Sequence, residues 1–174
     1  MTQEKSKQTA SDSLFSTAHR TASPIVIGHR TNRDQVIERA KSWLDPPVPY
    51  SQEKLHENKY GIYRTDCSGF VSMAWGIPGA PSNKHGGLDT IGLAQVGFEV
   101  AKRRLRAGDA LLCIEGTRLT RHVTLFADWA DRRCSTYWAF EQCGGTGTVY
   151  RRVVYPYEKA AFRYMPFRYS LIEN

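Results

Sequence analysis

The sequence predicts a single α+β domain in which helices come first and an antiparallel sheet follows. Apolar residues recur at helical spacing before residue 76, and short apolar runs typical of strands follow residue 108. Helices followed by a run of strands with short connections favour a segregated α+β architecture over a parallel α/β sheet. The length of 174 residues suits one domain with a substantial core.

The amino-terminal residues differ from the rest in composition. Residues 1–31 are rich in Ser and Thr without a sustained apolar period, so we expect a mobile arm ahead of a folded domain over 32–174. They lack the apolar core of a secretory signal, and no apolar run approaches the roughly 18 residues that a membrane span needs. We therefore expect no membrane span. Retention in the cell, another export route and a removed leader all stay open.

The first helix is predicted around residues 36–44, where apolar side chains recur at helical spacing. Asn32 or Asp34 can cap its start, and the prolines at 46–47 end it. The charged residues 51–65 that come later are expected to form an exposed loop.

The second helix is predicted to begin near Cys67. Its apolar residues fall on one side and are Phe70, Val71, Ala74 and Trp75. Gly76 and the prolines that follow end this helix. Residues 76–105 are expected to be a long loop, irregular up to about Ile91.

Four apolar runs predict the strands of the sheet. They cover residues 110–114, 122–127, 136–142 and 149–155. Two shorter segments, 162–164 and 167–169, can complete the antiparallel sheet.

Charge narrows the classes of partner. The net charge is +7 and the isoelectric point is near 9.4, which favours nucleic acid, membrane head groups or acidic cell-wall polymers as partners. The alternative is positive charge spread over a solvated surface. No zinc-finger spacing, basic heptad or aromatic RNA-binding signature accompanies the charge, so we expect no nucleic-acid partner.

The four cysteines, at positions 67, 113, 134 and 143, do not form a metal motif. No pair has the two-residue gap of a zinc knuckle or redox motif, and we expect neither a metal nor an organic cofactor. Cys134 and Cys143 could flank a strand and form a disulfide. Alternatively, Cys113, Cys134 and Cys143 are inert buried thiols.

Cys67 has the context of a nucleophile. A thiol attacks well only as thiolate, and the dipole and unpaired N–H groups of a helix N-terminus stabilise that anion. The same N–H groups can hold the oxyanion of a tetrahedral intermediate. The small neighbours Ser68 and Gly69 let a substrate backbone come close. The alternative is a core cysteine at a helix end.

His122 supplies a candidate base, because it opens a predicted strand and so lies at a strand end rather than in mid-core. A base also needs an orienting group on its second ring nitrogen. Glu141 and Gln142 lie in the next strand and point to opposite faces, so one of them at most can reach the imidazole. We favour Glu141, whose charge can stabilise imidazolium. An ion pair between Glu141 and an arginine is the alternative.

The segment from Asp66 to Val71 resembles the nucleophile motif of the NlpC-type peptidases, papain-like enzymes that hydrolyse cell-wall peptides. The resemblance continues in chain order over about residues 33–145. It takes in Pro49-Tyr50, the strand from Gly108 to Leu112, the histidine strand 122–126 and the strand 137–142. It implies a papain-like core in which the nucleophile helix packs on an antiparallel sheet.

The resemblance also implies roles and a substrate. Cys67 would be the acylated nucleophile, His122 the base, Glu141 its orienting residue and Tyr50 a hydroxyl near the oxyanion. Asp66 and Ser68 would help to bind the substrate's free amine. The substrate would be a peptidoglycan stem peptide, with anionic wall polymers as further partners. The site of action would be extracellular or in the cell envelope, and a toxin delivered into competitors is one form of this.

Three positions depart from the family pattern. Thr124 stands where a glycine usually follows the His-Val pair, two glycines after the tyrosine segment are absent, and the third catalytic residue is often a histidine. These departures indicate a divergent branch. Two other functions stay open: an acyltransferase with the same thiolate, and a non-catalytic module that binds the cell wall.

Overall fold

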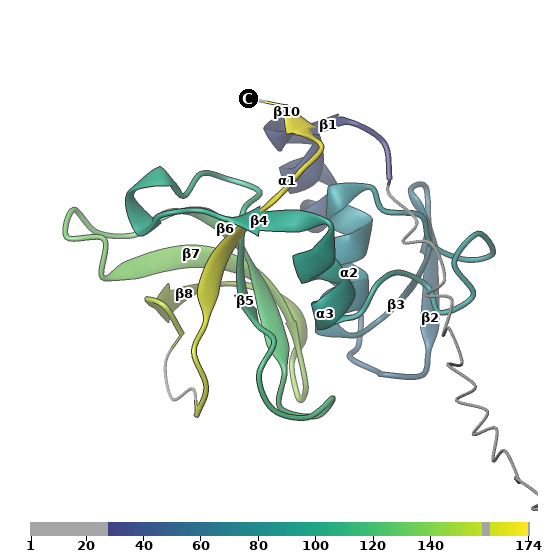
Figure 1. Cartoon of the computed structure of the whole chain (residues 1–174). Helices are drawn as coiled ribbons and strands as arrows, with labels where there is room; N and C mark the ends of the chain where they lie inside the picture. The colour runs from purple at the N-terminus through teal and green to yellow at the C-terminus, as the bar shows by residue number, and fades with distance from the viewer. Residues whose placement is uncertain (1–27, 158–160, 174) are drawn as a thin grey trace, which may run out of the picture.

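A computed structural model describes residues 28–157 and 161–173, and these form an α+β fold, as the sequence predicts (Figure 1). The helices are α1 (Arg33–Lys41), α2 (Cys67–Trp75), α3 (Thr90–Gln95) and a 3₁₀ turn, Lys102–Arg104. The strands are β1 (Thr31–Asn32), β2 (Leu55–Asn58), β3 (Gly61–Arg64), β4 (Gly97–Glu99), β5 (Ala110–Cys113), β6 (His122–Trp129), β7 (Thr136–Cys143), β8 (Gly147–Val154), β9 (Met165–Tyr169) and β10 (Ile172–Glu173).

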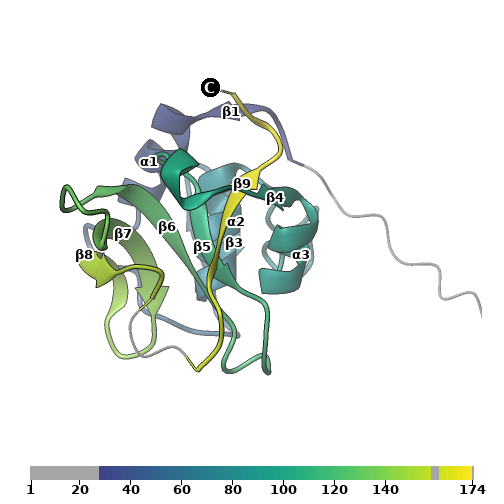
Figure 2. The ribbon, with the colours of Figure 1, turned by 60° about the vertical axis from the view of Figure 1, so that its left-hand side comes forward.

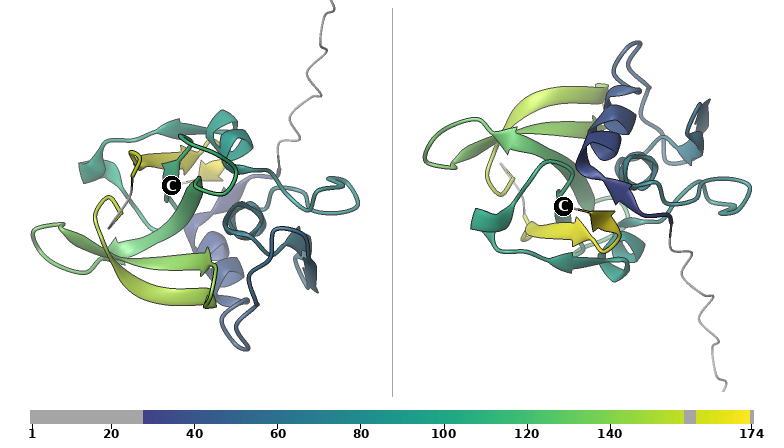
Figure 3. Two further views of the ribbon diagram at one scale, coloured as in Figure 1. Left: turned by 90° about the horizontal axis from the view of Figure 1, so that it is seen from below. Right: turned by 90° about the horizontal axis from the view of Figure 1, so that it is seen from above.

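The main sheet has six strands in the order β4-β9-β5-β6-β7-β8, and every neighbouring pair is antiparallel. Helix α2 packs on β6 and β7 with one side, and the antiparallel hairpin β2–β3 covers another side. Figure 3 looks nearly along α2 and shows the sheet and the hairpin on opposite sides of it. All nine residues of α2 are buried as a result.

The predicted first helix begins earlier and ends earlier than expected. Asn32 caps it: its side chain accepts from the N–H of Gln35 at 2.9 Å, and the Gln35 side chain accepts in return from the N–H of Asn32. The helix ends at Lys41, where Ser42 Oγ donates to the carbonyl of Arg39. Trp43 remains fully buried although it lies beyond the helix.

The boundary of the predicted arm falls close to the first described residues. Thr31 belongs to β1, which pairs in parallel with β10 at Ile172, so this residue is part of the fold rather than of the arm. Residues 1–27, which make up most of the predicted arm, lie outside the described residues.

Two segments expected to be loops contain regular structure. The charged segment 51–65 forms the hairpin β2–β3, whose outer residues are exposed while Tyr63 points into the core. The segment 76–105 contains α3 and β4, and α3 lies beside β4 at the edge of the sheet (Figure 2). The segment 162–164 is not a strand, since β9 begins at Met165.

Three observations concern membrane spans, disulfides and metal sites. None of the helices in the described ranges is long and apolar enough to cross a membrane. All four cysteines are free, so Cys134 and Cys143 are not joined. Within the same ranges, no group of three or more His, Cys, Asp or Glu side chains is arranged to hold a metal ion.

Candidate active site

Cys67 is the first residue of α2 and is 6% exposed. Asp66 precedes it as the N-cap, and Asp66 Oδ1 accepts from the N–H of Gly69 at 2.7 Å. Gly69 is required at this place, because a Cβ there would lie 2.0 Å from the carbonyl oxygen of Arg64. The Asp66 cap and the close approach at Gly69 hold the start of α2 next to β3, and this fixes the position of the thiol.

His122 is the first residue of β6, as the sequence predicts, and its imidazole faces the start of α2. The Nε2 atom of His122 lies 2.7 Å from Oε1 of Glu141 on β7. The side chain of Cys67 also interacts with this imidazole, and the interaction raises the pKa of His122. The structure thus brings Cys67, His122 and Glu141 into one chain of contacts.

The surroundings of His122 favour its charged form. Burial alone lowers the pKa of His122, but the hydrogen bonds with Cys67 and Glu141 outweigh burial and raise that pKa to about 9. An imidazolium at neutral pH is the partner that a thiolate needs. The surroundings of His122 therefore place a positive charge beside Cys67 at neutral pH.

Glu141 is fully buried and has three polar partners. Oε1 accepts from His122 and from the hydroxyl of Tyr157, and Oε2 accepts from Nε of Arg151 at 2.5 Å. Burial raises the pKa of Glu141, but these three hydrogen bonds outweigh burial and lower it to about 2. Oε1 thus contacts the imidazole, as expected of an orienting residue, and Oε2 pairs with an arginine, as the alternative interpretation expects.

Gln142 points to the other face of β7. Its Nε2 donates to the carbonyl of Val48 at 3.0 Å, and the N–H of Thr148 donates to the same oxygen at 3.1 Å. Val48 is two residues before Tyr50. Gln142 therefore holds the segment that carries Tyr50 and does not contact the imidazole.

Tyr50, Asp66, Cys67 and Ser68 line one cleft of about 570 Å³. The hydroxyl of Tyr50 accepts from Nε2 of Gln52 at 3.3 Å. Burial raises the pKa of Tyr50, and the nearby Cys67 and Asp66 add to this, so the hydroxyl keeps its proton. Four of the six side chains singled out in the sequence thus line the cleft, while His122 and Glu141 are not among its lining residues.

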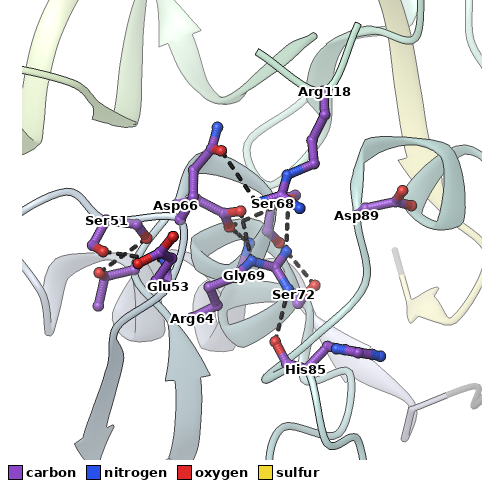
Figure 4. A network of polar contacts seen from close by, with 12 residues as sticks. Ser51, Glu53, Arg64, Asp66, Ser68, Gly69, Ser72, His85, Asp89 and Arg118 are labelled. Carbon is purple, nitrogen blue, oxygen red and sulfur yellow. Dashed lines mark hydrogen bonds and ion pairs between the residues drawn. The ribbon is translucent and has the colours of Figure 1, made fainter.

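Arg64 is the main residue of the cleft that the sequence did not indicate. Its Nε donates to Asp66 Oδ2 at 2.6 Å, and its Nη2 donates to Ser68 Oγ at 3.0 Å. The other contacts of the guanidinium are with the carbonyls of His85 and Leu88. Figure 4 shows Arg64 reaching across the start of α2 to the segment that contains His85.

The departures from the family pattern have local explanations. Thr124 is fully buried, and its Oγ1 lies 3.0 Å from the hydroxyl of Tyr137, so a hydroxyl partner occupies the space around its side chain. Ser51 follows the tyrosine, and its Oγ accepts from the N–H groups of Glu53 and Lys54, which makes the turn without a glycine.

Sequence comparisons add no family to this geometry. A scan against protein-family models finds no match, and a search of curated proteins finds no significant match. The functional assignment therefore depends on the residues of the cleft.

Proposed function

We propose that this protein is a papain-like cysteine hydrolase that cuts amide bonds in the stem peptides of peptidoglycan. The observation that carries the proposal is the contact chain from Cys67 through His122 to Glu141, with the thiol at a helix N-terminus and on the wall of a cleft. A thiol, an imidazole and an orienting carboxylate in this order are the groups that nucleophilic amide hydrolysis uses.

The reaction has two steps. The Cys67 thiolate attacks the carbonyl carbon of the amide, and His122 gives its proton to the leaving nitrogen as the C–N bond breaks, which leaves a thioester on Cys67. His122, now neutral, takes a proton from water, and the resulting hydroxide attacks the thioester. The acid is released and the thiolate–imidazolium pair returns.

The oxyanion would be held by the start of α2 and by Tyr50. The first intrahelical bond runs from the N–H of Phe70 to the carbonyl of Asp66, so the N–H groups of Cys67 and Ser68 precede it. Asp66 already takes the N–H of Gly69. The protonated hydroxyl of Tyr50 would add a donor from across the cleft.

Glu141 would orient the imidazole and stabilise its charge. Its partners Arg151 and Tyr157 fix the carboxylate, and neither of them lies in the cleft beside Cys67. A buried carboxylate that holds a histidine next to a thiol is more typical of a catalytic site than of a binding module. This arrangement therefore favours an enzyme.

The stem-peptide substrate comes from the resemblance of residues 66–71 to the NlpC-type nucleophile motif. Such a substrate would put the site of action in the cell envelope. The net charge of +7 supports attraction to anionic wall polymers. This hydrolysis consumes only the peptide and one water molecule. With an amine in place of water, the same thioester would give an acyltransferase.

Mass spectrometry of muropeptides released from purified sacculi tests the proposal. We expect wild-type protein to release peptide fragments with new free carboxyl ends, and Cys67→Ala protein to release none. Transfer products without free acid would instead identify the acyltransferase. Unchanged muropeptides with folded wild-type protein would reject the proposed substrate.

A further inference from the structure

Both carboxylate oxygens of Asp66 already have partners within the protein. Oδ1 accepts from the N–H of Gly69 at 2.7 Å and lies 3.3 Å from the hydroxyl of Ser68. Oδ2 is paired with Nε of Arg64 at 2.6 Å. A substrate ammonium group at this carboxylate would have to compete with the ion pair that Asp66 makes with Arg64.

The Arg64–Asp66 ion pair is fixed from several sides. The side chains of Arg64 and Asp66 are 14% and 12% exposed, so water screens the pair weakly. Further N–H groups of Arg64 donate to Ser68 Oγ and to the carbonyls of His85 and Leu88. Ser68, the second expected amine ligand, is thus also held by this guanidinium.

The other charged residues that line the cleft do not replace Asp66 as a site for an amine. The basic ones are Lys84, Arg118 and Arg121, in addition to Arg64. Besides Asp66, the acids that line it are Glu53 and Asp89. Glu53 is exposed on the rim, where an ion pair is weak. Asp89 caps α3 through the N–H of Gly92 and lies 3.9 Å from Arg121.

We infer that the subsite beside Cys67 binds the acyl part of a peptide whose amino terminus is blocked, and that it discriminates against a free ammonium group there. The inference rests on the proposed function and names its substrate class: stem peptides whose first amine is still in amide linkage, rather than peptides already released. The guanidinium of Arg64 occupies the position of the substrate cation and repels a second one.

Two matched peptides test this inference. They are one stem peptide with a free amino terminus and the same peptide N-acetylated, and kcat/KM is measured for each with the full-length protein. We expect the acetylated peptide to be cut at least tenfold better. Equal values, or a preference for the free amine, would overturn the inference while leaving the hydrolase intact. Cleavage of neither peptide would reject the proposed function itself.

Variants of Arg64 separate its charge from its structural bonds. Arg64→Met frees Oδ2 of Asp66, so the ratio of acetylated to free kcat/KM should fall at least tenfold. Arg64→Lys keeps the positive charge and should keep the preference. An unchanged ratio in folded Arg64→Met protein would contradict the role of Arg64. If Arg64→Met does not fold, the wild-type ratio still decides between the two peptides.

Discussion

The Nε2 atom of His122 lies 2.7 Å from Oε1 of Glu141, across the antiparallel strands β6 and β7. Leu125 pairs with Phe140, so one step further along the two strands Thr124 lies opposite Glu141. His122 is two residues from Thr124 and therefore lies on the same face of the sheet as Glu141. A residue on one strand reaches such a diagonal neighbour on the next. The contact follows from register, which is why Gln142, one residue further on, faces Val48 instead.

This register predicts different effects for two neighbouring residues. Glu141→Gln keeps the shape but removes the charge beside His122, so we expect kcat to fall about tenfold to a thousandfold. Gln142→Ala should change kcat far less and should lower the free energy of unfolding by about 1–3 kcal/mol, because it removes a buried hydrogen bond. Kinetics and thermal unfolding of both variants check this. A large loss of kcat in Gln142→Ala together with a wild-type kcat in Glu141→Gln would contradict the register.

The raised pKa of His122 predicts a pH profile. Since that pKa is about 9, kcat/KM should fall on the alkaline side near pH 9, as the proton for the leaving amine is lost. In Glu141→Gln this limb should move to lower pH, because one of the two hydrogen bonds that raise the pKa loses its charge. The stability from the raised pKa is fully present below 6.5, the ordinary value, and is lost as pH rises through about 9.

An NMR titration of the His122 ring gives a direct check of the same shift. Cys67→Ala should lower the pKa of His122, because it removes the hydrogen bond from Cys67 that helps to raise it. A His122 pKa near 6.5 in wild-type protein, unchanged in Cys67→Ala, would contradict the thiolate–imidazolium pair.

Gly69→Ala tests how the start of α2 is positioned. The added Cβ would meet the carbonyl oxygen of Arg64 at 2.0 Å, so α2 or β3 must shift. We expect a loss of about 1–3 kcal/mol in the free energy of unfolding, as for overpacking elsewhere, together with a loss of activity. Gly144→Ala is the matched control, because a Cβ there has no neighbour within 4 Å. Similar unfolding midpoints for the two variants would show that the contact is not tight.

The net charge of +7 predicts salt-sensitive binding to the cell wall. Screening shortens the Debye length from roughly 30 Å at 0.01 M salt to about 8 Å at 0.15 M, so retention on purified sacculi should fall steeply over this range. Hydrolysis of a small soluble peptide should change much less. Retention that does not depend on salt would rule out attraction by charge.

The sequence predicts those elements and residues that carry a local signal. The apolar side of α2, its start near Cys67 and the start of β6 at His122 are visible as patterns over a few residues. The hairpin β2–β3 was missed because its residues are mostly charged or half-exposed, and α3 because six residues hold too few periods to be recognised.

Long-range side-chain contacts leave no such pattern. Arg151 and Tyr157 reach Glu141 from β8 and from the segment after it, and Arg64 reaches both Asp66 and His85. Each contact depends on how separate elements pack. The acid in the apolar run at Glu141 did indicate that a partner exists, but many arginines could have supplied it.

The most direct test of the account is the turnover of Cys67→Ala beside that of the other three cysteine variants. We expect no detectable hydrolysis of a stem peptide by Cys67→Ala, with an unfolding midpoint close to that of the wild type. Cys113→Ala, Cys134→Ala and Cys143→Ala should each retain activity, since these thiols lie outside the cleft. A Cys67→Ala protein that keeps most of its wild-type rate would contradict the mechanism at its first step.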